Sequence, residues 1–154
     1  MSGIVGGAGS KSGVIGTTEL DYEEGEWTPN FTDNGQSNTA GNSVQEGFYR
    51  KIGNVVYITG KFTCTSISAL NGGQDAILTG LPFTVKNATG CDSAFTIGYC
   101  AGVSITAGQS IVLNVQKNLK IAYLMKWSAT GGQGFVSCTN FNNGNITWSG
   151  HYFV

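Results

Sequence analysis

The chain contains few charged residues, few prolines and a single histidine. Only 11% of its 154 residues are Asp, Glu, Lys or Arg, less than half of the ~25% typical of soluble domains. With 40% hydrophobic residues and a net charge of −1, it also lacks the highly charged, weakly hydrophobic composition of a disordered protein. Two prolines and the lack of a Gly-X-Y period exclude a collagen-like or Pro-rich low-complexity chain.

Long apolar runs are also missing. No run approaches the ~20 residues of a membrane-spanning helix, and the first residues lack the basic flank and apolar region of a signal peptide. The formal charge is −4 over residues 1–26 and +3 over residues 27–154, where the basic residues are scattered and form no stripe. We therefore expect neither nucleic acid nor a membrane as a partner.

The residue types of common catalytic and metal sites are scarce. His151 is the only histidine, so we expect it on a polar face or at a subunit contact rather than as a general base. No EF-hand or phosphate-binding loop pattern occurs. The four cysteines match no zinc spacing and, without a sign of export, are expected to be free packed thiols: Cys64, Cys91, Cys100 and Cys138. The sequence predicts no enzyme, cofactor or metal site.

An acidic cluster occupies residues 19–26. Paired carboxylates could in principle hydrolyse a glycosidic bond, but that chemistry needs a fixed separation between them. We expect this segment to be a flexible leader, in which the distance between two carboxylates is not fixed. A solvated or docking acidic loop is therefore the preferred interpretation, with the docking residues Glu19, Asp21, Glu23 and Glu24.

What the chain has in excess is glycine, with 24 residues, alongside many β-branched and aromatic residues. Short runs of these residues alternate with Gly and Asn turns, which favours strands over helices. In residues 55–64, the alternation predicts that Val56, Ile58, Gly60 and Phe62 face the core. We predict an all-β fold of about eight strands, an antiparallel, jelly-roll-like β-sandwich over residues 19–154. Residues 119–126 are the one segment for which a helix is an alternative to a strand.

Residues 1–18 have a different composition. A glycine recurs every few positions, and such a segment cannot bury enough apolar surface to offset its chain entropy. We predict an extended N-terminal arm that contacts another chain through four apolar residues, Ile4, Val5, Val14 and Ile15.

Aromatic residues offer the remaining binding candidates. Trp27 and Trp148 are expected in the core. Trp127 lies beside Lys126 and before a Ser/Gly loop, so we predict that both residues contact a subunit interface or a glycan. Tyr49 is a third candidate for such a contact.

Three sets of residues resemble small β-rich domains of tailed-phage virion proteins. They are residues 22–29 (YEEGEWTP), residues 47–62 (GFYRKIGNVVYITGKF), and residues 80–83 (GLPF) with 149–154 (SGHYFV). The motifs keep their order along residues 22–154, and they consist of turn glycines, a strand-ending proline and aromatic positions. The resemblance therefore implies shared architecture more than a shared ligand.

The family resemblance implies a virion protein, assembled in the host cytoplasm. A tail fibre usually has a shaft, and we expect none here because only the arm precedes the β domain. We therefore favour a capsid decoration (cement) protein, a homotrimer bound to the major capsid protein. The first alternative is the receptor-binding tip of a tail fibre or spike, joined to tail proteins and contacting host glycans through the loops at 33–46, 66–74 and 131–134. The second is a glycan-degrading enzyme that uses the acidic cluster.

Overall fold

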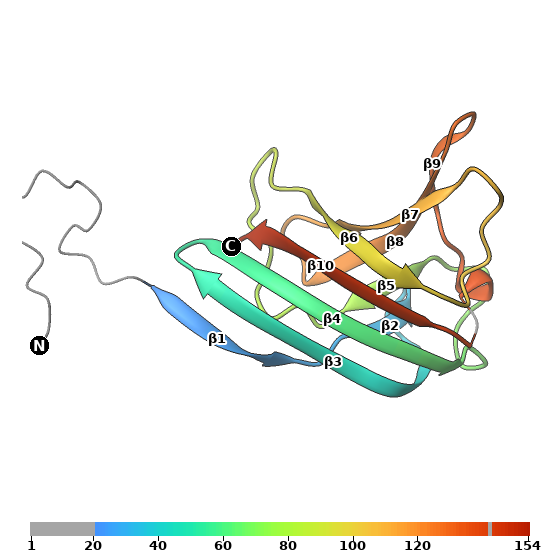
Figure 1. Ribbon diagram of the computed structural model, residues 1–154, viewed down its shortest axis with the longest axis horizontal. Helices are drawn as coiled ribbons and strands as arrows, with labels where there is room; N and C mark the ends of the chain where they lie inside the picture. The colour runs from blue at the N-terminus through green and yellow to red at the C-terminus, as the bar shows by residue number, and fades with distance from the viewer. Residues whose placement is uncertain (1–20, 142) are drawn as a thin grey trace, which may run out of the picture.

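The computed structural model describes residues 21–141 and 143–154, and these residues are almost entirely β-structure (Figure 1). A short 3₁₀ helix, η1 (Cys138–Asn140), precedes the last strand. The strands are β1 (Tyr22–Trp27), β2 (Asn30–Asp33), β3 (Gly41–Ile52), β4 (Val55–Ser66), β5 (Ala76–Thr79), β6 (Ser93–Cys100), β7 (Ser110–Val115), β8 (Ile121–Ser128), β9 (Gly132–Phe135) and β10 (Asn145–Phe153).

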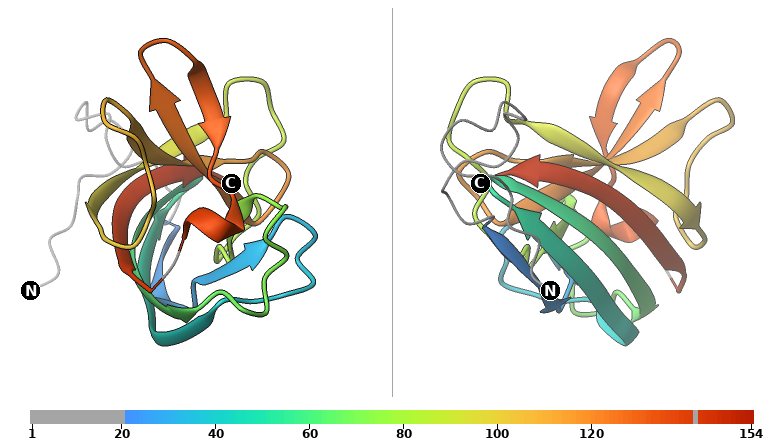
Figure 2. Two further views of the ribbon diagram at one scale, coloured as in Figure 1. Left: turned by 90° about the vertical axis from the view of Figure 1, so that its right-hand side faces the viewer. Right: turned by 60° about the vertical axis from the view of Figure 1, so that its left-hand side comes forward.

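All strand pairs are antiparallel, and they join into one sheet with the order β1-β3-β4-β10-β6-β7-β8-β5-β2, while β9 pairs with β8. The sheet curls on itself, so that a first half-sheet (β1-β3-β4-β10) faces a second half-sheet (β7-β8-β5-β2), with β6 joining the two (Figures 1 and 2). The antiparallel all-β class is confirmed, and the jelly-roll-like sandwich stays a prediction.

The core lies between the two half-sheets. Phe31 of β2 packs edge-on against Phe62 of β4, with ring centroids 5.1 Å apart, and contacts Phe141 at 4.9 Å. Val56, Ile58 and Phe62 are buried, whereas Tyr57, Thr59 and Lys61 on the opposite face of β4 are exposed, as the period of two predicts.

Residues 121–128 form β8, which confirms a strand in this segment and excludes its helical alternative. Other local predictions were wrong. Residues 103–106 alternate like a strand in the sequence, but they contribute one bridge, between Val103 and Phe141. Two expected loops are shorter, because β3 begins at Gly41 and β9 at Gly132. Residues 22–27 form a strand because β3 supplies a full set of backbone partners, which the local acidic sequence does not reveal.

Two tryptophans and two glycines form one row across the inner face of the first half-sheet. The pairing registers Trp27↔Gly47, Gly47↔Gly60 and Gly60↔Trp148 place the four residues side by side on β1, β3, β4 and β10. A Cβ at Gly47 would overlap the Trp27 indole, and one at Gly60 would overlap that of Trp148. Both rings therefore lie flat across a neighbouring strand that has no side chain at that point.

The two indoles meet over these glycines. Their ring centroids are 6.1 Å apart with an interplanar angle of 66°, an edge-to-face arrangement. The Trp27 Nε1 group reaches two strands away and donates to the Thr59 carbonyl at 3.3 Å. This Trp–Gly row ties β1, β3, β4 and β10 together from inside, and both indoles are buried, as expected.

We expect Gly60→Ala to destabilise the domain by about 1 to 3 kcal/mol, because the added methyl group forces the Trp148 ring to move within a packed core. Gly98→Ala in β6 is the matched control, since its Cβ would meet only Thr147 Oγ1 at 3.7 Å. Urea denaturation measures both free energies of unfolding. Equal stability of the two variants would contradict the packing described for this row.

Candidate binding surface

The outer face of the first half-sheet exposes side chains in aligned cross-strand rows. The inner and outer positions alternate along each strand, so the residues that flank Trp27, Gly47, Gly60 and Trp148 point to solvent. The strand registers define four outer rows: Tyr22, Ile52, Val55 and Phe153; Glu24, Arg50, Tyr57 and His151; Glu26, Phe48, Thr59 and Ser149; and Glu46, Lys61 and Thr147, with Tyr99 of β6 beside Thr147. We refer to these rows together as the outer face.

Large hydrophobic side chains gather on this face. Six of the exposed large hydrophobic residues in the described part of the chain belong to it: Tyr22, Phe48, Ile52, Tyr57, Tyr99 and Phe153. The Glu24 carboxylate accepts from Tyr22 Oη at 2.5 Å and lies 3.5 Å from Arg50 Nε. His151 lies on this polar and aromatic face, its ring centroid 5.8 Å from that of Tyr57.

Two open depressions run along the outer face. The larger, of about 710 Å³, is bordered by Glu24, Phe48, Arg50, Tyr57 and Thr59. The smaller adjoins it at Phe48 and Thr59 and continues toward Lys61 and Thr147. The face is thus an extended, shallow surface rather than a closed pocket.

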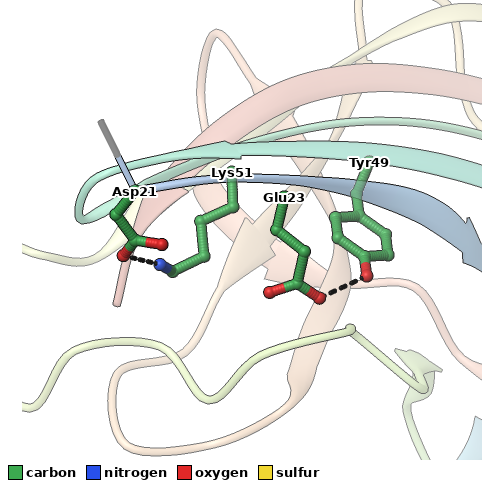
Figure 3. A network of polar contacts seen from close by, with 4 residues as sticks. All are labelled: Asp21, Glu23, Tyr49 and Lys51. Carbon is green, nitrogen blue, oxygen red and sulfur yellow. Dashed lines mark hydrogen bonds and ion pairs between the residues drawn. The ribbon is translucent and has the colours of Figure 1, made fainter. Parts of the chain in front are cut away.

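The acidic segment has a defined place in the sheet. Asp21 pairs with Lys51 Nζ, and Glu23 accepts from Tyr49 Oη at 2.7 Å; Figure 3 shows these side chains on one side of β1 and β3. The hydrogen bond to Glu23 raises the pKa of Tyr49. Glu24 lies on the opposite, outer side. The expectation of a flexible acidic leader was wrong for residues 22–26, because backbone pairing with β3 holds them in place.

The residues that carry the family resemblance converge at one end of the core. Tyr152 is buried, and its Oη accepts from Phe83 N at 3.2 Å and donates to Phe83 O at 3.3 Å. The Phe83 ring packs edge-on against Tyr49, with centroids 5.3 Å apart, and Tyr49 reaches Glu23. One chain of hydrogen bonds and ring contacts therefore joins residues from all four of these segments.

Asp33 joins two of the loops predicted to contact a host. Its buried carboxylate accepts from Asn38 Nδ2 at 2.6 Å, Ser37 N at 3.2 Å and Asn71 N at 3.3 Å. These contacts hold the loop after β2 against the loop after β4. The hydrogen bond from Asn38, followed by those from backbone amides, lowers the pKa of Asp33.

Trp127 lies on a separate element. The β8–β9 hairpin projects from the body (Figure 2). Trp127 of this hairpin is exposed and follows the half-buried Lys126. Tyr49 belongs to β3 and is occupied with Glu23 and Phe83, so these three predicted contact residues do not form one contiguous set of contacts. Their role in binding stays a prediction. Ile4, Val5, Val14, Ile15 and Glu19, with the predicted arm at 1–18, lie outside the described residues.

The cysteines are free, as predicted, and Cys64 and Cys138 are buried. Burial raises the pKa of the Cys64 and Cys100 thiols, and that of Cys138 to about 11, which favours the protonated thiol at neutral pH. Within residues 21–141 and 143–154, no cluster of His, Cys, Asp and Glu suited to a metal ion occurs. The same residues include no helix long and apolar enough to span a bilayer.

The outer face was not predicted from the sequence. The alternation that directs Val56 and Ile58 inward also directs Val55 and Tyr57 outward. The sequence therefore did contain one indication of an exposed aromatic face, namely the aromatic residue Tyr57 at an outward position. The alignment of Tyr57 with Arg50 and His151 depends on the pairing of β3, β4 and β10.

These features define an antiparallel all-β domain with an exposed aromatic sheet face. No protein-family model matches the chain, and no curated protein matches its sequence. Its fold is similar to part of the crystal structure of the Dettilon tailspike protein, with a TM-score of 0.71 and 16% sequence identity over 86% of this chain. The match covers 24% of the tailspike chain, so this chain corresponds to a minor part of that protein. At this identity the likeness shows a shared fold.

We expect the stability that Asp33 provides to depend on pH. The pKa of Asp33 is lower in the folded chain than in the unfolded chain, where it is ~3.9. The contribution is therefore complete above that value and is lost as the pH falls through the folded pKa. Melting temperatures should show Asp33→Asn below wild type at neutral pH, with a difference that shrinks below about pH 4. A difference that is constant down to about pH 2 would contradict this assignment.

Removing the Tyr152 hydroxyl should cost about 1 to 3 kcal/mol, because Phe83 N and O lose their hydrogen-bond partner inside the fold. The measurement is the free energy of unfolding of Tyr152→Phe. Tyr99→Phe removes an exposed hydroxyl from β6 and is the control, expected within about 0.5 kcal/mol of wild type. If Tyr152→Phe is as stable as the control, the hydroxyl has no anchoring role.

Proposed function

We propose that this chain is a non-enzymatic β-domain of a tailed-phage tail spike or tail fibre, with a role in assembly and host attachment. The observation that supports the proposal most directly is the fold likeness to the Dettilon tailspike protein, which extends over 86% of the chain. A second support is the resemblance of the sequence to phage virion domains in residues 22–29, 47–62, 80–83 and 149–154. In the fold, these segments meet around Tyr49, Phe83 and Tyr152.

Attachment would use the exposed ends of the domain. The loops after β2 and β4 are joined through Asp33, which gives a contact surface a fixed shape at low entropic cost. The β8–β9 hairpin adds the exposed rings of Trp127 and Phe135. Aromatic rings beside amide and hydroxyl groups are suited to saccharides, so a host surface glycan is the proposed ligand of these loops.

The capsid decoration function predicted from the sequence stays an alternative proposal. Its support came from the predicted N-terminal arm, whose residues lie outside the described part of the chain. The structural likeness favours the tail, since the similar protein is a tailspike. Both proposals make the chain a virion component.

The position of the protein on phage particles tests the proposal. Antibodies against the purified chain, coupled to gold, would be applied to virions of the encoding phage and viewed by electron microscopy. We expect label at the tail, and none in a control that uses antibodies pre-absorbed with the chain. Label over the head would favour decoration and contradict the tail assignment. Virions that contain none of the protein by mass spectrometry would contradict both.

A further inference from the structure

The outer face presents an apolar row that solvent-facing sheets rarely have. Tyr22, Ile52, Val55 and Phe153 lie side by side on four consecutive strands, and three of them are exposed. Monomeric proteins seldom expose a contiguous apolar patch of more than a few hundred Å². Four strands ~4.8 Å apart and four rows ~6.8 Å apart give the whole outer face, its polar rows included, a flat footprint on the order of 400 Å². A contact through this face falls at the small end of protein–protein interfaces, which at standard size bury about 800 Å² per partner.

The composition of the row favours a protein partner over a saccharide. Sugars stack on aromatic faces and need nearby polar groups, whereas Ile52 and Val55 are aliphatic and lie in the middle of the row. The row forms one end of the outer face and adjoins the row that holds Glu24, Arg50 and His151; apolar residues bordered by charged ones are typical of a protein–protein interface.

The charges of the outer face divide by strand. Glu24 and Glu26 are on β1 and Glu46 is on β3, whereas Lys61 is on β4 and His151 on β10. Arg50 of β3 is the exception, and it is already paired with Glu24. The β1 side is thus acidic, and the β4–β10 side carries the Lys61 ammonium group and the His151 imidazole.

This division makes the face complementary to a second copy of itself. Rotation about a symmetry axis parallel to the strands leaves the position of each row along the strand direction unchanged. Each row of one copy therefore faces the same row of the next copy, with the β1–β3 side of one copy against the β4–β10 side of the other. Glu46 then approaches Lys61 of the other copy, Glu24 approaches His151, and Arg50 can lie over the Tyr57 ring. The apolar row meets the apolar row of the other copy.

We infer that the outer face is the contact through which copies of this chain associate, around an axis parallel to the strands of the first half-sheet. The inference goes beyond the proposed function, since it names an interface and an orientation that hold for a head or a tail protein. The homotrimer predicted from the sequence is one assembly of this kind. Glycan contact by the loops and the β8–β9 hairpin is compatible with it, because these elements lie outside the outer face.

Sedimentation equilibrium of the full 154-residue chain, at several concentrations, tests the inference. We expect wild type to associate and Ile52→Glu to weaken association about tenfold or more, because the change places a charge in the centre of the apolar row. Ile105→Glu is the matched control: Ile105 is 42% exposed and Ile52 is 41% exposed, but Ile105 lies in the loop after β6. The control should associate like wild type.

Each outcome of these measurements supports or overturns the inference that the outer face is a contact between copies. Circular dichroism first establishes that the variants are folded; if Ile52→Glu is not, Phe48→Ser, on the same face, replaces it. Wild type that sediments as single chains at all concentrations, or equal weakening by Ile52→Glu and Ile105→Glu, would overturn the inference. So would single chains whose binding to host polysaccharide is lost in Ile52→Glu, which would assign the face to a saccharide. The labelling of virions is a separate measurement, so failure of either proposal is recognised by itself.

Discussion

The packing of two tryptophans over two glycines is the constraint on which the first half-sheet depends. Trp27 and Trp148 come from β1 and β10, and their rings meet above the bare backbone of Gly47 and Gly60. A side chain at either glycine would separate the rings from the sheet. Because the arrangement allows one alignment of four strands, it fixes their register, and a slip by one residue would turn every side chain to the other face.

The inner register determines what the molecule presents outside. With Trp27, Gly47, Gly60 and Trp148 in one inner row, Phe48, Thr59 and Ser149 are aligned in the outer row beside it, next to the row of Arg50, Tyr57 and His151. The unusual composition follows from the same architecture. Some glycines make room for aromatic rings rather than for turns, and the scarcity of charge fits a surface that includes an extended apolar row.

The sequence allowed the fold class and several core positions to be predicted, because alternation within one strand is a local signal. Val56, Ile58 and Phe62 are examples. The strand at Tyr22–Trp27 was missed because its acidic residues follow no apolar alternation, and it depends on partners about 25 residues away in β3. The outer face and the Asp33 contacts were missed for the same reason: they join residues from different strands and loops, whose alignment is a property of the folded sheet.

Native-state hydrogen exchange tests most directly the claim that the Trp–Gly row holds the first half-sheet together. Amides that exchange only by global unfolding mark the most stable part of a domain. The account predicts that the slowest-exchanging amides are those of β3, β4 and β10 around Gly47, Gly60 and Trp148, and that the amides of the projecting β9 exchange much faster. If the slowest amides lie instead in β7 and β8, with those around Gly60 exchanging as fast as β9, the row is not the element on which the sheet depends.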